Sequence, residues 1–158
     1  MRLKTRKNKI KIALISSGGG HLFQMYSLKK WWSKYNHFWI TFDRIEVRSM
    51  LQKERKYFAS FPESRNILNA LRNLFLAVKI LRNERPTLLI SCGAGIAPPF
   101  FLVGKLFRIK MIFIEPYDFI KYPSLSARIV EPFVDILLVQ HKEQLKNFRR
   151  AKFVGPLL

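Results

Sequence analysis

Residues 10–21 read IKIALISSGGGH, and the order of residue types in them predicts the architecture of the domain. The near-continuous apolar run at 10–15 is typical of a strand buried on both faces of a parallel sheet. The glycines that follow let the backbone approach a ligand closely, and a helix that starts there offers free N–H groups and a positive dipole end. The stretch therefore predicts a strand, a phosphate-cradling turn and the start of a helix.

A second stretch repeats this order farther along the chain. Residues 88–95 read LLISCGAG, so an apolar strand again ends in a glycine turn. Strand and helix signals alternate around these turns, which predicts a single Rossmann-like α/β domain with a parallel sheet and helices on both faces. The carboxyl ends of the strands would form the binding edge for a phosphorylated or diphosphate ligand.

Hydrophobic patterns place the remaining elements. We expect strands at 10–15, 37–42, 57–60, 88–91, 110–114, 136–139 and 152–154, and helices at 21–33, at 67–81 and from Pro98 or Pro99 to 107. The apolar residues of the helix at 67–81 form one stripe, which we expect to face the core. We expect a basic N-terminal arm at 1–9 and the domain at 10–158, with the chain stopping where a two-lobed enzyme would cross into its second lobe.

Positive charge dominates the chain. It carries 29 Lys+Arg against 10 Asp+Glu, a formal net charge of +19, and no acidic residue precedes Asp43. This excess implies acidic partners: nucleic acid, an anionic membrane surface or a phosphate-bearing substrate. No helix-turn-helix, zinc-finger or RNP pattern accompanies the charge, so nucleic acid is the weaker expectation. No apolar run reaches the length of a membrane span.

The sequence predicts neither a metal nor an organic cofactor. No His, Cys, Asp or Glu residues have metal-ligand spacing, and the single cysteine, Cys92, excludes an internal disulfide and fits a reducing compartment. Gly18 and Gly20 match the start of a dinucleotide fingerprint, and Asp43 lies where a ribose-binding acid is expected. Phe23 stands where the fingerprint has its third glycine, and we expect it to obstruct helix–strand packing. This argues against a nicotinamide-dependent oxidoreductase.

Two titratable residues are candidates for catalysis. His21 lies at the expected helix start, where a neutral imidazole can accept a proton or bond a diphosphate; the alternative is a structural hydrogen bond to the backbone. Glu115 directly follows the strand at 110–114 and can act as a general base or orient a hydroxyl. Its alternative is a salt bridge to one of the many cationic side chains.

Several short motifs follow one another in a specific order. They are SGGGH at 17–21 with Gln24 and Met25 after it, GAGIAPP at 93–99, FIE at 113–115, SLS at 124–126, Gln140, and VGPL at 154–157. In this order they resemble the membrane-associated subunit of the two-component N-acetylglucosaminyltransferase of dolichol-linked oligosaccharide assembly, a family with bacterial counterparts in capsular and exopolysaccharide synthesis. The chain departs from the family pattern at Pro116, Ala127 and His141, where Ser, Gly and Trp are common.

The resemblance implies the acceptor-side, N-terminal lobe of a GT-B glycosyltransferase. Such a lobe is inactive alone, because a separate donor-lobe subunit binds the UDP-sugar. The acceptor would be a polyprenyl-diphosphate-linked sugar in bacterial capsular or exopolysaccharide biosynthesis, with His21 and Glu115 as the catalytic candidates. The implied substrate-binding residues are Ser17, Gly18, Gly19, Gly20, Gly93, Ala94, Gly95, Ser124 and Ser126.

The same resemblance implies a peripheral location at the cytoplasmic face of the cell membrane, since this sequence lacks the N-terminal span of the eukaryotic members. Residues 96–107 combine phenylalanines with Lys105 and the following Arg108, which suits contact with an anionic bilayer. The alternative is a stand-alone protein that binds a phosphorylated ligand or nucleic acid.

Overall fold

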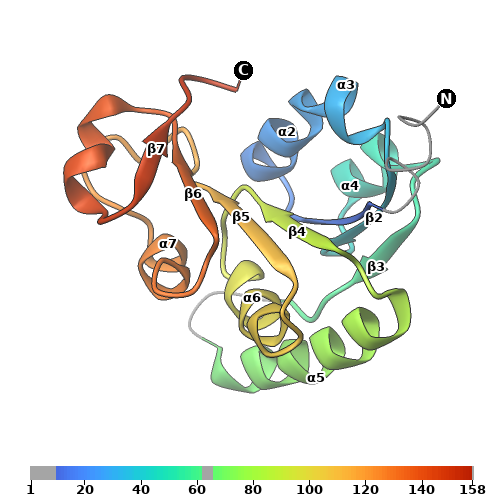
Figure 1. Ribbon diagram of the computed structural model, residues 1–158. Helices are drawn as coiled ribbons and strands as arrows, with labels where there is room; N and C mark the ends of the chain where they lie inside the picture. Colours follow the sequence, from blue (N-terminus) through green and yellow to red (C-terminus); the bar gives the residue numbers. More distant parts are fainter. Residues whose placement is uncertain (1–9, 62–65, 158) are drawn as a thin grey trace, which may run out of the picture.

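The computed structural model describes residues 10–61 and 66–157, so the basic arm expected at 1–9 lies outside the described residues. Over the described ranges the chain forms a seven-stranded, all-parallel sheet in the order β3-β2-β1-β4-β5-β6-β7 (Figure 1). The strands are β1 (Lys11–Ile15), β2 (Asn36–Thr41), β3 (Lys56–Phe58), β4 (Leu88–Ser91), β5 (Lys110–Ile114), β6 (Ile136–Val139) and β7 (Ala151–Phe153). The helices are α2 (Gly20–Ser27), α3 (Lys29–Trp32), α4 (Ile45–Met50), α5 (Ile67–Glu84), α6 (Ala97–Leu106) and α7 (Leu125–Val130), with a 3-10 helix η1 (Lys142–Asn147).

The strand order reverses between β1 and β4. From β1 the chain moves outward to β2 and β3, then returns to β4 and continues through β7 on the other side. Helices α2, α3 and α4 cover one face of the sheet, and α5, α6 and α7 cover the other (Figure 1). The connections after β1 and β4 therefore leave the carboxyl edge toward opposite faces, and open α/β sheets bind ligands at such a point.

Two apolar cores join these layers. Under α2, α3 and α4, the fully buried Trp32 and Trp39 meet edge to face with ring centroids 5.4 Å apart. Under α5, α6 and α7, Phe101 and Phe113 meet in the same way at 5.9 Å. Residues 12–15 of β1 are fully buried, because helices cover both faces of the strand. The continuous apolar character of this strand predicts that burial correctly.

The sequence predicts most elements within two residues. The bounds of β4, β5 and β6 are confirmed, and the other strands differ from expectation by one or two residues. The single helix expected at 21–33 is wrong: Leu28 ends α2 and precedes α3. The helices α4, α7 and η1 are not predicted, because six residues are fewer than two helical turns and give no readable periodicity.

The stripe of apolar residues on α5 does not face the core, contrary to expectation. Ile67 is 80% exposed and Phe75 is 74% exposed, whereas Leu81 is buried. The buried side of α5 instead includes Asn73, which accepts from the backbone N–H of Ser60 at 2.7 Å and donates to its carbonyl at 3.0 Å. A buried polar side chain is stable there because both of its hydrogen-bonding groups are satisfied.

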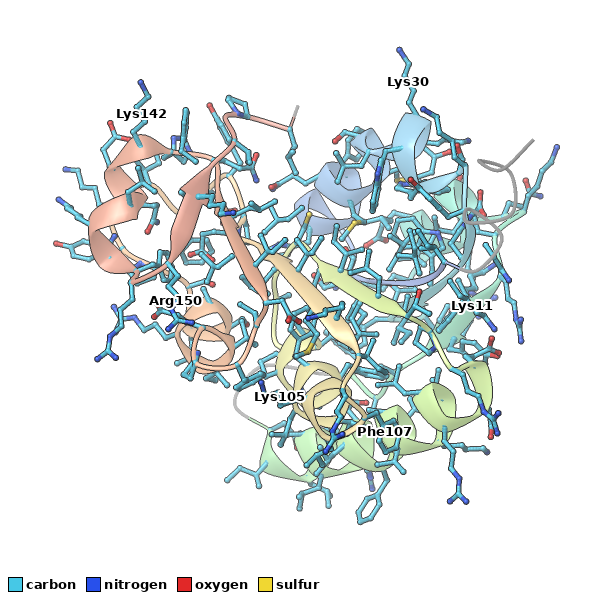
Figure 2. The ribbon with its side chains drawn as sticks, viewed as in Figure 1. Lys11, Lys30, Lys105, Phe107, Lys142 and Arg150 are labelled. Carbon is cyan, nitrogen blue, oxygen red and sulfur yellow. The ribbon has the colours of Figure 1, made fainter. Side chains whose placement is uncertain are left out.

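The exposed apolar residues of α5, together with those of α6, of Phe107 after it and of α7, form what we call the outer apolar face. This outer apolar face lies on the side of the sheet away from α2 and α3, and Figure 2 shows Lys105 and Phe107 on that side with Lys30 on the opposite one. No helix within 10–61 and 66–157 has the combined length and hydropathy needed to cross a membrane. The outer apolar face consists of Ile67, Leu68, Leu71, Phe75, Val78, Leu102, Leu106, Phe107, Leu125 and Ile129.

Candidate functional site

The first glycine turn, residues 16–20, connects β1 to α2. Gly19 has a φ of 66°, in the left-handed region that favours glycine, and α2 begins at the next residue without a side-chain cap. The first N–H groups of α2 are therefore not used by a cap and can meet an anion. Arg44 and Glu46, from the start of α4, lie against Gly18 on the other side of the turn.

The second glycine turn, residues 92–95, connects β4 to α6. Gly93 has a φ of 92°, and Ala94 has a φ of 69°, which is uncommon for a residue with a Cβ atom. The Ser91 hydroxyl accepts a hydrogen bond from the Gly93 N–H at 3.1 Å. A β-carbon at Gly93 would lie 2.6 Å from the ring of Pro116. The turn is therefore packed tightly against the end of β5, and non-glycine backbone strain at Ala94 is a feature that clusters at functional sites.

His21 joins the two turns. Its Nδ1 lies 2.9 Å from the carbonyl oxygen of Cys92. Because a carbonyl only accepts, Nδ1 must carry the proton, and a neutral ring then presents a lone pair at Nε2. Nε2 has no hydrogen-bond partner among the residues that the structure describes, and the side chain is half-buried. Nδ1 thus makes the structural hydrogen bond to the backbone that is one of the two expectations for His21. Nε2 remains available to accept a proton or a hydrogen bond.

Glu115 lies behind the turns in the protein interior. The residue is 1% exposed, and its two carboxylate oxygens accept hydrogen bonds from the N–H of Ser124 at 2.5 Å and from its hydroxyl at 2.8 Å. The Ser124 hydroxyl in turn accepts from the N–H of Ala127 at 3.1 Å and so caps α7. Within the described ranges no Lys or Arg pairs with Glu115, so the salt bridge that was the alternative for this residue is absent there. Both carboxylate oxygens of Glu115 are thus engaged by Ser124 in the interior.

Two glutamines extend this buried network. The Nε2 of Gln140, after β6, donates to Oε1 of Gln24 at 2.7 Å and to the carbonyl of Glu115 at 3.0 Å. Gln24 Oε1 also accepts from the N–H of Tyr117 at 3.0 Å, and Gln140 Oε1 accepts from the N–H of Leu157 at 2.9 Å. The network ties α2 to the ends of β5 and β6 and to the segment that follows β7. The sequence marks both glutamines only as motif residues, and their contact could not be read from positions 116 residues apart.

Burial of Glu115 predicts a pH-dependent stability. Desolvation raises the pKa of this carboxyl to about 7, although the Ser124 hydrogen bonds act to lower the pKa. The folded state therefore holds the proton more tightly than the unfolded state, and the free energy of unfolding should fall as the pH rises. From the shift we expect a loss of about 2 kcal/mol between pH 5 and pH 7.5. Urea unfolding at several pH values measures the loss. Glu115→Gln should remove it, and an unchanged pH profile in this variant would contradict the assignment.

Several other predicted residues are placed differently from expectation. Phe23 is 61% exposed, so the expectation that it obstructs helix–strand packing is wrong. Asp43 accepts two hydrogen bonds from Arg48, at 2.5 and 2.6 Å, which lowers the pKa of the carboxyl and engages the group expected to bind a ribose. Ser17 is buried before the glycines of the first turn, and Ser126 is buried on α7. No group of three or more His, Cys, Asp and Glu side chains that could hold a metal occurs in the described part of the chain.

Known proteins are similar in sequence to most of this chain. The family model described as "Oligosaccharide biosynthesis protein Alg14 like" matches residues 12–157. The UDP-N-acetylglucosamine transferase subunit alg14 of Schizosaccharomyces pombe is 34% identical over 76 residues, which cover 48% of this chain and 34% of that protein. The UDP-N-acetylglucosamine–N-acetylmuramyl-(pentapeptide) pyrophosphoryl-undecaprenol N-acetylglucosamine transferase of Caldanaerobacter subterraneus is 30% identical over 110 residues, 70% of this chain and 28% of that enzyme.

Solved structures show the same fold. Acinetobacter baumannii MurG superposes with a TM-score of 0.76 at 12% identity, over 93% of this chain and 46% of that one. The UDP-GlcNAc 2-epimerase of Methanocaldococcus jannaschii superposes with a TM-score of 0.71 at 11% identity, over 93% and 46%. The chain thus spans less than half of each of these relatives, as one lobe of a GT-B fold does. The expected single Rossmann-like lobe is confirmed.

Proposed function

The chain belongs to the family of Alg14-like oligosaccharide biosynthesis proteins, and from this membership we propose that it is the acceptor-side subunit of a two-component UDP-N-acetylglucosamine transferase that acts on a lipid-linked sugar. The observation that carries the proposal is the His21 bridge between the two glycine turns, at the point where the strand order reverses. The bridge holds two anion-compatible turns and one free imidazole nitrogen together at a single binding edge.

The acceptor's diphosphate occupies the space beside the two turns. The uncapped N–H groups at the start of α2 and the positive end of its dipole favour a diphosphate there. Bound in this way, the diphosphate places the acceptor sugar near Nε2 of His21. The hydroxyl proton passes to Nε2 as the oxygen attacks the anomeric carbon of the donor, and UDP leaves with the electrons of the broken C–O bond. Glu115 and Ser124 fix the start of α7 beside this site rather than taking part in proton transfer.

A separate donor-side subunit supplies the UDP-sugar. The relative from Schizosaccharomyces pombe is itself named as a subunit of such a transferase. The partner would cover the carboxyl edge, where Gln140 holds the segment that follows β7 by its bond to Leu157. We place the product of the complex in bacterial surface polysaccharide assembly, as a capsule or exopolysaccharide precursor.

Reconstitution tests this function. Radiolabelled UDP-N-acetylglucosamine and a membrane lipid extract are incubated with this chain, with a donor-side partner, and with both proteins. Lipid-linked product should rise at least about tenfold when the two proteins are mixed, because neither lobe alone brings donor and acceptor together. Equal transfer by either protein alone, or none with any UDP-sugar, would contradict the two-subunit assignment.

A peripheral membrane location accounts for the outer apolar face. On α5, α6 and α7 the cationic side chains are Arg72, Lys79, Arg82, Lys105 and Arg128. The acidic residue of these helices, Glu84, is buried and paired with Lys11 and Arg55. Exposed apolar side chains on helices whose exposed charges are cationic suit the boundary of an anionic bilayer.

Vesicle binding should therefore depend on this face. Phe75→Asp removes an exposed ring and adds a negative charge, so binding to vesicles that contain anionic phospholipid should weaken at least about tenfold. Phe23→Asp makes the same chemical change at an exposed phenylalanine on the opposite side of the sheet and should leave binding unchanged. Co-sedimentation measures both variants, and an equal effect of the two would show that the membrane does not select this face.

A further inference from the structure

An apolar groove of about 790 Å³ runs between the first half of α5 and the neighbouring helices α6 and α7. Its walls include Leu71 and Leu74 of α5, Pro99 and Leu102 of α6, and Ile129 of α7. None of the residues that line it is charged. The volume lies within the range of about 300–1,000 Å³ that small-molecule pockets occupy. The groove is therefore large enough for a flexible hydrocarbon and offers almost no partners to a polar occupant.

One end of the groove reaches the candidate site. Gly95, the last residue of the second glycine turn, lines the groove, and so does Ser126 of α7. Ser126 lies two residues after Ser124, which Glu115 holds in place. Leu71, Leu102 and Ile129 also belong to the outer apolar face. The groove thus connects the place proposed for the diphosphate with the surface proposed to meet the bilayer.

We propose that this groove binds the first isoprene units of the acceptor's polyprenyl chain, next to the diphosphate. The inference rests on the proposed function and assigns the lipid part of the substrate to a specific site. An uncharged hydrocarbon that follows a diphosphate matches the change along the groove, from a glycine turn at one end to leucine, isoleucine and proline walls. A peptide would bury backbone polar groups against these walls without hydrogen-bond partners, which costs free energy. The groove then helps the protein to draw the diphosphate of a membrane lipid toward His21.

The test uses soluble prenyl diphosphates of increasing length together with a variant that fills the groove. Inorganic pyrophosphate and geranyl, farnesyl and geranylgeranyl diphosphate are titrated by calorimetry into the wild type, Ala70→Trp and Val78→Trp. Ala70 lines the groove on the exposed side of α5, so tryptophan there fills it without disturbing the core. Val78 is exposed on the same helix and does not line the groove, which makes it the matched control.

The affinity of the wild type for the prenyl diphosphates should rise about tenfold with each added isoprene unit until the groove is full. Val78→Trp should keep this dependence, and Ala70→Trp should reduce it to less than about threefold per unit while pyrophosphate binds all three proteins equally. A flat series in the wild type, or an undiminished one in Ala70→Trp, would overturn the groove assignment and leave the diphosphate site standing. Absence of binding by every diphosphate, pyrophosphate included, would overturn the proposed function and the groove with it. If Ala70→Trp weakens only the association with the donor-side partner, the occupant is protein and the proposal is wrong.

Discussion

Replacement of His21 by alanine should lower sugar transfer by the reconstituted two-subunit enzyme about 10²–10⁴-fold, the usual contribution of a positioned general base. The Nδ1–H bond to the Cys92 carbonyl leaves Nε2 as the basic nitrogen, at the junction of the two glycine turns. If Nε2 takes the acceptor proton, the loss falls on kcat. A role limited to bonding the diphosphate would instead appear mainly in KM for the lipid acceptor.

His21→Asn separates the chemical from the structural role. An asparagine side-chain N–H can replace Nδ1–H and donate to the Cys92 carbonyl, but it supplies no basic nitrogen where Nε2 lies. We therefore expect Asn to restore the stability that Ala loses, about 1 kcal/mol by urea unfolding, without restoring transfer. Recovery of transfer in His21→Asn would show that the imidazole only joins the turns.

The meeting of the two glycine turns at one edge of the sheet could be predicted from the sequence, because its signals are local. Each glycine turn follows a buried strand directly, and parallel strands end at one edge whatever their order in the sheet. The contact between His21 and Cys92 could not be predicted, because it depends on β1 and β4 being neighbours, and that adjacency joins positions 71 residues apart. Local sequence therefore indicates the kind of site, and the strand order determines which atoms meet in it.

The hydrogen bonding of Glu115 and the orientation of α5 could not be predicted, for a different reason. A scarce acid at a strand end suggests chemistry, but the sequence does not reveal that the N–H and hydroxyl of Ser124 satisfy both carboxylate oxygens in the interior. In α5 the periodicity correctly indicates an amphipathic helix but not the direction of its apolar stripe. Asn73 is buried because the Ser60 backbone satisfies it, and the apolar stripe is left to face outward. Hydrophobic patterns assume that the core takes the more apolar side of a helix, and α5 departs from that assumption, since Ile67 and Phe75 are exposed.

Substitution of Gly93 by alanine should destabilise the protein by about 3 kcal/mol, the sum of a left-handed backbone penalty and overpacking. A β-carbon at this position would lie 2.6 Å from Cγ and 3.1 Å from Cδ of Pro116. The proline ring cannot turn aside as a flexible side chain can. Relief of the clash must therefore move the backbone next to Glu115 and disturb the carboxylate that holds Ser124 and α7.

The first glycine turn supplies graded controls for this prediction. At Gly20 a β-carbon meets nothing within 4 Å and the backbone is helical, so Gly20→Ala should be neutral or stabilise by up to about 1 kcal/mol. Gly19→Ala has the same open space but a φ of 66° with a ψ of −138°, so it isolates the backbone penalty of about 1–3 kcal/mol. Urea midpoints at a constant m-value should therefore rank Gly20→Ala above Gly19→Ala and Gly93→Ala last. If Gly93→Ala matched Gly19→Ala, the contact with Pro116 would carry no cost. The second turn would then accept the added β-carbon without displacing the backbone next to Glu115.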